Sequence, residues 1–338
     1  MNPSAWQIRR RQDRRRAVGL ACACILLPGV LVPAVLLAQD FPARPVRIVV
    51  PFAPGGGNDA FARHLASSMS EALKQSVIVE NRAGAGGTLG SDLVAKAKPD
   101  GYTLLLGHTG TLAINPALYP RLPYDAKNAF VAVGPLASAP LVLVVPAASR
   151  IKSVPDLVAA AKAEPGKLTY ASSGSGTGGH LAAKLLEQGT DVTLLHVPYR
   201  GTAPALNDVI GGQVDMMFSV IPPAMAHVES GRLRAIAVTG KRRNERIPDV
   251  PTVAEAGIAG YESTLAYGLV APKGTPAPVL DTLGAAMAAS VDSPKLREAF
   301  RQEGAEPMTG TPAEFEAHMQ AESQKYGRLI EAADIKVE

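Results

Sequence analysis

The sequence predicts an α/β fold with two similar lobes, each built on a mainly parallel β-sheet. From residue 39 onward, β-rich runs alternate with helical patterns, and short Gly- and Pro-containing segments separate them. This series starts twice, and in each series a glycine loop follows a strand, at 55–57 and at 174–179. Two apolar, β-rich runs, 140–146 and 264–271, lie where the chain would cross between the lobes. Two such crossing strands would form a hinge.

The first series begins with the buried strand VRIVVPF at 46–52. In the helix that follows, Phe61, Leu65 and Met69 recur every four residues and form one apolar stripe. Asp59 is placed to cap the first turn of this helix. The series continues with predicted strands at 76–82, 102–108 and 140–146 and with a helix that opens at 86–97.

The second series begins with a helix at 154–164, which Ser153 can cap. Its remaining elements are predicted strands at 167–172, 192–199, 214–219 and 233–240, a glycine loop followed by a helix at 174–189, and a helix at 202–212. After the strand at 264–271, the chain is predicted to be helical at 280–291, 293–300 and 312–333. The predicted domains are a first lobe at 39–142 and 266–338 and a second lobe at 143–265.

Residues 1–38 have the pattern of a secretory signal peptide. Six arginines precede a long apolar run, and Ala38 is a suitable residue before the cleavage point. The alternative is a permanent membrane anchor, although Pro28 and Pro33 interrupt the apolar run. Twin-arginine export and a lipoprotein modified at Cys22 are further alternatives. We therefore expect an exported, periplasmic protein.

Charge and cysteine content exclude several classes of protein. The chain has 34 Lys+Arg and 30 Asp+Glu, and removing the six arginines and one aspartate of the leader leaves 28 against 29. This balance gives no reason to expect nucleic-acid binding. Both cysteines, Cys22 and Cys24, lie in the leader, so the mature chain has no thiol. The six histidines show no H-x-x-x-H spacing, and we expect neither a metal nor a cofactor.

The glycine loops are the main candidates for a binding site. Residues 174–179 match the dinucleotide pattern G-x-G-x-x-G, but the next strand, 192–199, does not end in the acidic residue that would hold a ribose. Each loop instead ends a strand and opens a helix, which presents backbone N–H groups and a positive dipole end to an anion. Any one of these loops could be only a tight turn. Two loops at matching places favour a shared carboxylate site.

A secreted hydrolase is the alternative from a different class. His180 lies one turn into the helix after the second glycine loop, and Ser172, Ser173 and Ser175 are near it in sequence. However, there is no G-x-S-x-G segment, and such serines more often donate hydrogen bonds than attack carbonyls. Arg200 could meet an anion at the cleft, could lie in solvent or could pair with Asp208. The basic run at 241–246 is interpreted as a solvated surface.

Seven segments, in order along residues 51–276, carry a family likeness. They are PFAPGGGNDAFAR, ENRAGAGGTLG, DGYTLLLG, NPALYPRLPYD, YASSGSGTGGHLAAKLL, HVPYRGTAPALNDVIGGQVDMMF and GLVAPKGTP. Together they resemble the periplasmic solute receptors of tripartite tricarboxylate transporters, the Bug-type receptors. The resemblance implies a type II-like "Venus flytrap" binding protein, with no catalytic role, that acts as a monomer and delivers an organic acid to a membrane permease. A ligand sensor that signals to a membrane partner would use the same clamp.

The resemblance also implies which residues bind the ligand. In the first lobe these are Phe52, Gly55, Gly56, Gly57 and Asp59, with Thr109 and Thr111 beside them. In the second lobe they are Ser173, Gly176 and Thr177, with His180 in support, and Arg200, Gly201, Ala203 and Pro204, with Asp208 ordering this last loop.

One departure from the family leaves the ligand open. The family often has a tryptophan in the returning hinge strand, where this chain has Ala266. A smaller residue there would enlarge the pocket or leave Tyr267 to fill it. The expected ligand classes remain di- and tricarboxylates, acidic amino acids and aromatic acids.

Overall fold

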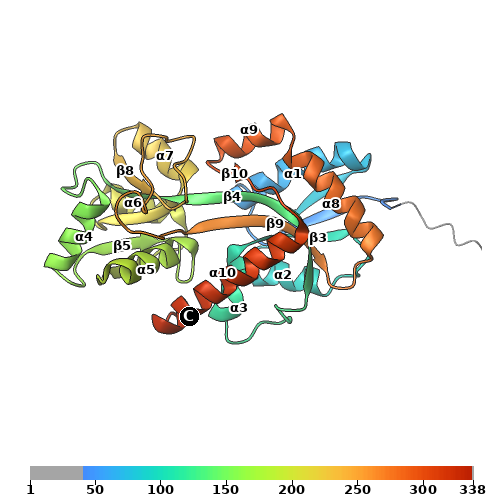
Figure 1. The fold of residues 1–338 in the computed structure, drawn as a ribbon, viewed down its shortest axis with the longest axis horizontal. Helices are drawn as coiled ribbons and strands as arrows, with labels where there is room; N and C mark the ends of the chain where they lie inside the picture. The colour runs from blue at the N-terminus through green and yellow to red at the C-terminus, as the bar shows by residue number, and fades with distance from the viewer. Residues whose placement is uncertain (1–40, 337–338) are drawn as a thin grey trace, which may run out of the picture. The chain divides into compact units, whose positions relative to one another are not determined.

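The strands form two sheets that share one long strand. In the computed structural model, which describes residues 41–336, strand β4 (Phe130–Pro146) lies beside β9 (Thr264–Pro272) in the middle of the fold (Figure 1). β4 pairs with β9 up to Pro140, and from Leu141 onward it pairs with β7 and β8. The predicted leader, including its alternatives and its cleavage after Ala38, lies outside the described residues.

The first sheet has the strand order β2–β1–β3–β9–β4, with β10 added along β4. Its other strands are β1 (Val46–Val50), β2 (Val77–Asn81), β3 (Thr103–His108) and β10 (Glu306–Pro307). The second sheet continues from β4 and consists of β7 (Met216–Val220), β5 (Thr169–Ser172), β6 (Leu195–Pro198) and β8 (Leu233–Val238). This two-lobed α/β arrangement confirms the predicted fold class.

The parallel strand pairs all include β1 or β5. β1 pairs in parallel with β2 and β3, and β5 pairs in parallel with β6 and β7. All the pairs made by β4 and β9 are antiparallel. The crossing strands therefore make each sheet a mixed one.

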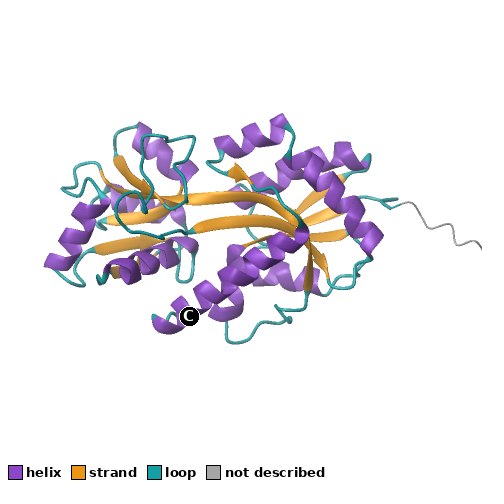
Figure 2. Ribbon diagram, viewed as in Figure 1, coloured by secondary structure: helices purple, strands orange, loops and turns teal. Residues whose placement is uncertain are grey.

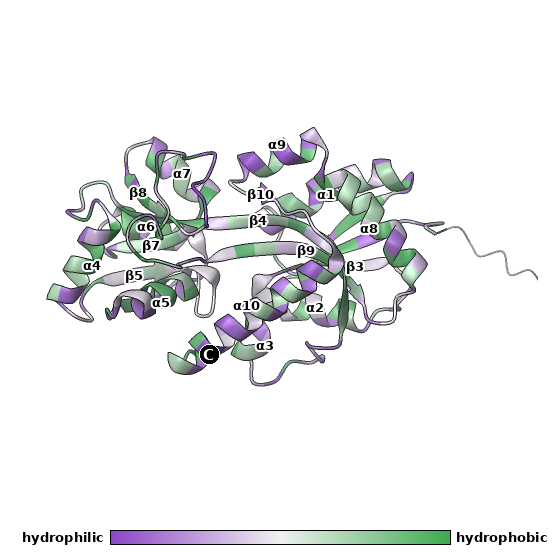
Figure 3. Cartoon of the chain, in the orientation of Figure 1, coloured by the Kyte–Doolittle hydropathy of each residue, from purple (hydrophilic) through white to green (hydrophobic). Residues whose placement is uncertain are grey.

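Helices cover both faces of each sheet (Figure 2). On the first sheet, one face packs against α1 (Gly57–Leu73), α8 (Ala277–Val291) and α9 (Pro294–Gln302), and the other packs against α2 (Thr88–Ala95) and α10 (Pro312–Ala332). On the second sheet, α4 (Val154–Ala163) and α5 (Gly178–Thr190) cover one face, and α6 (Thr202–Ile210) and α7 (Ile221–Glu229) cover the other. Helices α9 and α10 show both hydrophilic and hydrophobic residues, as expected for covering helices (Figure 3).

Helix α1 shows how the sequence pattern positions an element. Phe61, Leu65 and Met69 are buried against the first sheet, as their spacing predicted. Each such side chain stabilises the fold by about 1.5–3 kcal/mol when fully buried. The predicted cap at Asp59 is wrong. Gly56 is the N-cap and Asp59 lies inside the first turn, where its carboxylate accepts a hydrogen bond from the N–H of Gly55.

Four short helical segments were not predicted. A 3₁₀ turn (Ala85–Gly87) precedes α2, and a π-helical turn (Gly110–Ile114) leads into α3 (Asn115–Leu118) after β3. α7 follows β7 directly and starts with two prolines, Pro222 and Pro223. Within residues 41–336, no helix is both long enough and apolar enough to span a membrane.

Candidate functional site

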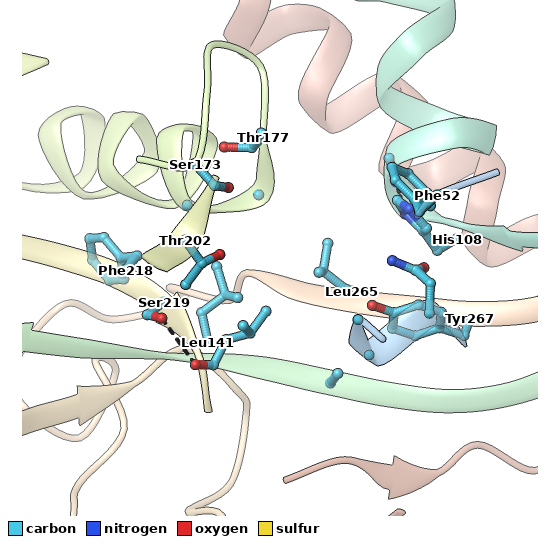
Figure 4. A pocket seen from close by; sticks show the side chains of 18 of the residues that line it. Phe52, His108, Leu141, Ser173, Thr177, Thr202, Phe218, Ser219, Leu265 and Tyr267 are labelled. Carbon is cyan, nitrogen blue, oxygen red and sulfur yellow. Dashed lines mark hydrogen bonds between the residues drawn. The ribbon is translucent and has the colours of Figure 1, made fainter. Parts of the chain in front are cut away.

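A cavity of about 550 Å³ lies between the two lobes. Figure 4 shows Phe52, His108 and Tyr267 on one side of it and Ser173, Thr177 and Thr202 on the other. The crossing strands β4 and β9 contribute its floor through Ala139, Pro140, Leu141, Leu265 and Tyr267. Loops at the carboxyl ends of the parallel strands form its two walls, which is where ligands bind in open α/β sheets.

The first-lobe wall is the loop that joins β1 to α1. Gly55, Gly56 and Gly57 line the cavity, and a Cβ atom built on any of them would meet no other atom within 4 Å. Gly55 also has a φ of +85°, a backbone conformation that residues with a side chain rarely adopt. Among the described residues no side chain caps the N-terminus of α1, which leaves its first N–H groups available to an anion.

Two polar residues support this loop in different ways. Asp59 is not in the cavity wall. Its carboxylate accepts hydrogen bonds of 2.9 Å from Gly55 N–H and from Arg63 Nε, and the Arg63 bond lowers the pKa of Asp59. Asn58 does line the cavity, and its buried Oδ1 has no hydrogen-bond partner among the described residues.

Aromatic rings close the first-lobe side of the cavity. Phe52 stacks on His108 with ring centroids 5.0 Å apart, and His108 in turn contacts Tyr267 at 5.4 Å. His108 accepts a hydrogen bond at Nδ1 from the Gly110 N–H, 2.7 Å away. Burial lowers the pKa of His108 to about 4, so this ring is neutral at physiological pH.

Thr109 and Thr111 lie behind this group rather than in the wall. Thr109 Oγ1 accepts a hydrogen bond from Ala266 N–H, and Thr111 Oγ1 bonds the backbone of His108. Ala266 is buried in the cluster that contains Phe315, on the other side of β9 from the cavity. The small side chain of Ala266 therefore does not enlarge the cavity, and the neighbouring Tyr267 lines the wall from the other face of β9.

The second-lobe wall is the loop Ser173–Thr177, which joins β5 to α5. Ser173, Gly176 and Thr177 all line the cavity, as do Gly178 and Gly179 in the first turn of α5. Gly176 has a φ of +74°, and a Cβ on it would lie 2.1 Å from the side chain of Leu118 in the first lobe. Thr177 is the N-cap of α5, but its hydroxyl bonds Gly174 O and leaves the helix N–H groups uncapped.

His180 lies beneath this loop, outside the cavity wall. Its Nδ1 accepts a hydrogen bond of 2.9 Å from Gly176 N–H. Its ring stacks on His196 with centroids 4.0 Å apart. Burial and the neighbouring His196 lower the pKa of His180 to about 3.

The third expected segment, 200–204, reaches the cavity only at Thr202. Arg200, Gly201, Ala203 and Pro204 are absent from the wall, and the side chain of Arg200 is exposed. Asp208 lies behind the segment and accepts a hydrogen bond of 2.6 Å from the hydroxyl of Tyr199, which fixes the start of this turn.

Sequence reasoning missed several wall residues. The segment Met217–Pro223, from the end of β7 into α7, lines the cavity, as do Leu118, Tyr119 and Glu303. A strand followed at once by a proline-started helix was a usable signal for the first of these, because ligands bind at such strand ends. Leu118 and Glu303 lie far away in sequence, and only the folded chain brings them to the cavity.

The wall carries little charge. Glu303 is the one charged residue that lines the cavity in the part of the chain that the structure describes, and no lysine or arginine does so. Helix N-termini and backbone N–H groups are therefore the positively polarised groups that this wall offers to an anion. Across residues 41–336, no group of three or more His, Cys, Asp and Glu side chains could hold a metal ion.

Comparison with known proteins places this fold and cavity in a family. The sequence model of the tripartite tricarboxylate transporter family receptor matches residues 61–335. The chain is 45% identical over 291 residues to a UPF0065 protein in the tcbD-tcbE intergenic region of Pseudomonas sp. strain P51, covering 86% of each chain. It is 35% identical over 319 residues to the protein BugT of Bordetella pertussis, covering 94% of this chain and 98% of BugT.

Two solved structures with bound acids have the same fold. Rpa4515 of R. palustris with adipate aligns with a TM-score of 0.79 and 36% identity, covering 88% of this chain and 99% of that one. MatC of Rhodopseudomonas palustris with bound malate aligns with a TM-score of 0.74 and 34% identity, covering 86% and 100%. The chain therefore belongs to the family of tripartite tricarboxylate transporter receptors, the Bug-type solute receptors.

Proposed function

We propose that this protein is a periplasmic receptor that closes its two lobes on a small organic acid and delivers it to a tripartite tricarboxylate-type permease. One observation carries the proposal. Two uncapped helix N-termini, those of α1 and α5, and their glycine loops belong to opposite walls of one cavity. Backbone donors in such a place bind carboxylates without a cationic side chain.

The lobes of the proposed clamp are 39–142 with 266–338, and 143–265. The change of partner along β4 between Pro140 and Leu141 supports this division, as does the return of the chain through β9. We further propose that residues 1–38 direct export and are removed after Ala38. We also propose action as a monomer and delivery to a permease rather than to a signalling partner, as the family resemblance implies.

The proposed contacts are the wall residues of the expected set, namely Phe52, Gly55, Gly56, Gly57, Ser173, Gly176 and Thr177, together with Thr202. Apolar residues such as Leu118, Phe218 and Leu265 make up much of the remaining wall. The ligand classes remain di- and tricarboxylates, acidic amino acids and aromatic acids. Adipate and malate, the acids bound to the two similar structures, are the first members to test.

We propose no catalytic role, and one contact has to be weighed against this. Ser172 Oγ lies 2.7 Å from His196 Nε2, which is the kind of bond that a serine hydrolase requires. Ser172 is fully buried, however, and neither residue lines the cavity. His180, the histidine expected for this alternative, instead accepts its bond from Gly176.

The first experiment is a thermal-shift screen of the purified protein against organic acids, aromatic acids and acidic amino acids. A ligand at one hundred times its Kd stabilises the folded state by about 2.7 kcal/mol, so a dose-dependent rise in Tm is expected for one class of carboxylate. Adipamide, which has the shape of adipate without its charges, and sodium chloride at matched ionic strength are the controls. Equal shifts with adipate and adipamide, or no shift with any acid, would contradict the proposal.

A further inference from the structure

The loop Ser173–Thr177 is held from beneath by two histidines that the cavity itself does not use. His180 Nδ1 accepts the hydrogen bond from Gly176 N–H, at 2.9 Å. Gly176 has a positive φ and packs against Leu118 of the other lobe, so this amide lies at a point where the two lobes meet. The bond from His180 therefore fixes the part of the loop that faces the first lobe.

The second histidine holds the other end of the same loop. His196 Nε2 lies 2.7 Å from Ser172 Oγ, and this hydroxyl interacts with both the N–H and the C=O of Gly174. His196 also stacks on both His180, at 4.0 Å, and Tyr170, at 4.8 Å. Ser172 and His180 are buried, so water is poorly placed to replace either bond.

The geometry requires His180 to be neutral. A backbone N–H can only donate, so the Nδ1 atom that accepts from Gly176 carries no proton. Lys184, whose ammonium pairs with Glu187 at 2.6 Å, and His196 are the groups that further disfavour a charge on His180. Burial, followed by the charge of Lys184, lowers the pKa of His196 to about 4. Tyr170 faces the stack as an uncharged phenol, because its pKa is raised by burial and by Glu187.

We propose that His180 and His196, acting as neutral hydrogen-bonding groups, are positioning residues that hold the Ser173–Thr177 loop in its ligand-receiving shape. They touch no part of the cavity and act only through Gly176 and through Ser172 with Gly174. The role in ligand binding rests on the function proposed above, whereas the hold on the loop does not.

Reciprocal substitutions test this proposal, because the two histidines use different ring nitrogens. The asparagine amide oxygen can take the place of the accepting Nδ1 of His180, and the glutamine amide, which can donate or accept, can take the place of Nε2 of His196. We expect His180→Asn to keep the loop and His180→Gln or His180→Leu to lose it. At position 196 the order reverses, with His196→Gln retaining the loop and His196→Asn losing it. A packing role alone would not produce this reversal.

The readouts are amide hydrogen exchange at Gly174 and Gly176 without ligand and the affinity for adipate by calorimetry. In the position-180 variants that lose the hydrogen bond, amide exchange at Gly176 should become at least about tenfold faster. In the corresponding position-196 variants, the faster exchange should occur at Gly174. Each loss should weaken adipate binding by a similar factor. Equal behaviour of the Asn and Gln variants at either position overturns the proposal. If the unsubstituted protein does not bind adipate, the affinity arm speaks against the proposed ligand, and the exchange arm still decides the role of the histidines.

Discussion

Glycine plays two different roles among the residues near the cavity. At Gly90 and Gly179 a Cβ would lie 2.7 Å from the Pro51 backbone and 2.5 Å from the Phe218 carbonyl oxygen, so these glycines are required by the fold. At Gly56 the backbone is extended, with φ −93° and ψ 173°, and a Cβ would enter open space. The fold therefore tolerates a side chain at Gly56, and only a ligand in the cavity would meet it.

Gly56→Val is expected to weaken binding of the carboxylate identified by the thermal-shift screen at least about tenfold. The free energy of unfolding should fall by no more than about 1 kcal/mol, the cost of a less favourable N-cap residue. Ala53→Val, in the same loop but outside the cavity wall, is the matched control and should leave affinity unchanged. Calorimetric titration and urea unfolding measure the two effects. Unchanged affinity in Gly56→Val would mean that the loop is only a turn.

One buried side chain links the two crossing strands where their backbone pairing ends. Thr239, at the end of β8, accepts a hydrogen bond of 2.7 Å from Leu141 N–H at its Oγ1, and the same hydroxyl donates to the Ser263 carbonyl just before β9. Thr239 has no exposed surface. It thus ties β4 and β9 together at the point where β4 changes from one sheet to the other.

Thr239→Val keeps the shape of the side chain and leaves a buried backbone N–H without its partner. We expect the free energy of unfolding to fall by about 1–3 kcal/mol, the cost of an unsatisfied buried donor. Thr282→Val is the control, because the Thr282 hydroxyl bonds Pro278 O on an exposed helix surface and should cost little. Urea unfolding monitored by circular dichroism gives both values. Equal losses in the two variants would show that the Thr239 bond has no special role.

For the whole molecule, buried histidines link stability to pH. His108 and His180 are 8% and 4% exposed, and their pKa values are lowered to about 4 and about 3, chiefly by burial. In the unfolded chain each would titrate near 6.5. Below that pH the unfolded state binds protons that the folded state does not bind. The free energy of unfolding therefore falls as the pH drops from about 6.5 to 4.

Each of these two histidines should contribute a slope approaching about 1.4 kcal/mol per pH unit in this window. Urea unfolding at pH 7, 5.5 and 4.5 measures the slope, and His180→Asn should reduce it. The same substitution at the exposed His64 is the control. The pKa of Asp59 is lowered in the folded state, so this residue contributes stability that is lost only below its unfolded pKa of about 3.8. Its effect therefore lies outside the range from pH 6.5 to 4. A free energy of unfolding that stays constant between pH 6.5 and 4.5 would contradict the lowered pKa values of His108 and His180.

The sequence by itself determined the features that depend on neighbouring residues. The stripe of Phe61, Leu65 and Met69, the cap at Ser153 and the glycine loops after β1 and β5 are local patterns, and the structure contains each of them. The two-lobed fold could be predicted because alternating strands and helices allow few arrangements. The family blocks supplied the rest of that prediction.

Only the tertiary structure decided which residues meet across the cavity. The family resemblance predicted Arg200 among the ligand contacts, yet its side chain is exposed outside the wall. The residues Leu118 and Glu303, which are distant in sequence, line the wall instead. The pairing of Ser172 with His196, rather than with the closer His180, depends on β5 lying beside β6. The register of the strands and the packing of the two lobes bring these residues together. Both arise from packing summed over many residues, so no single stretch of sequence encodes them.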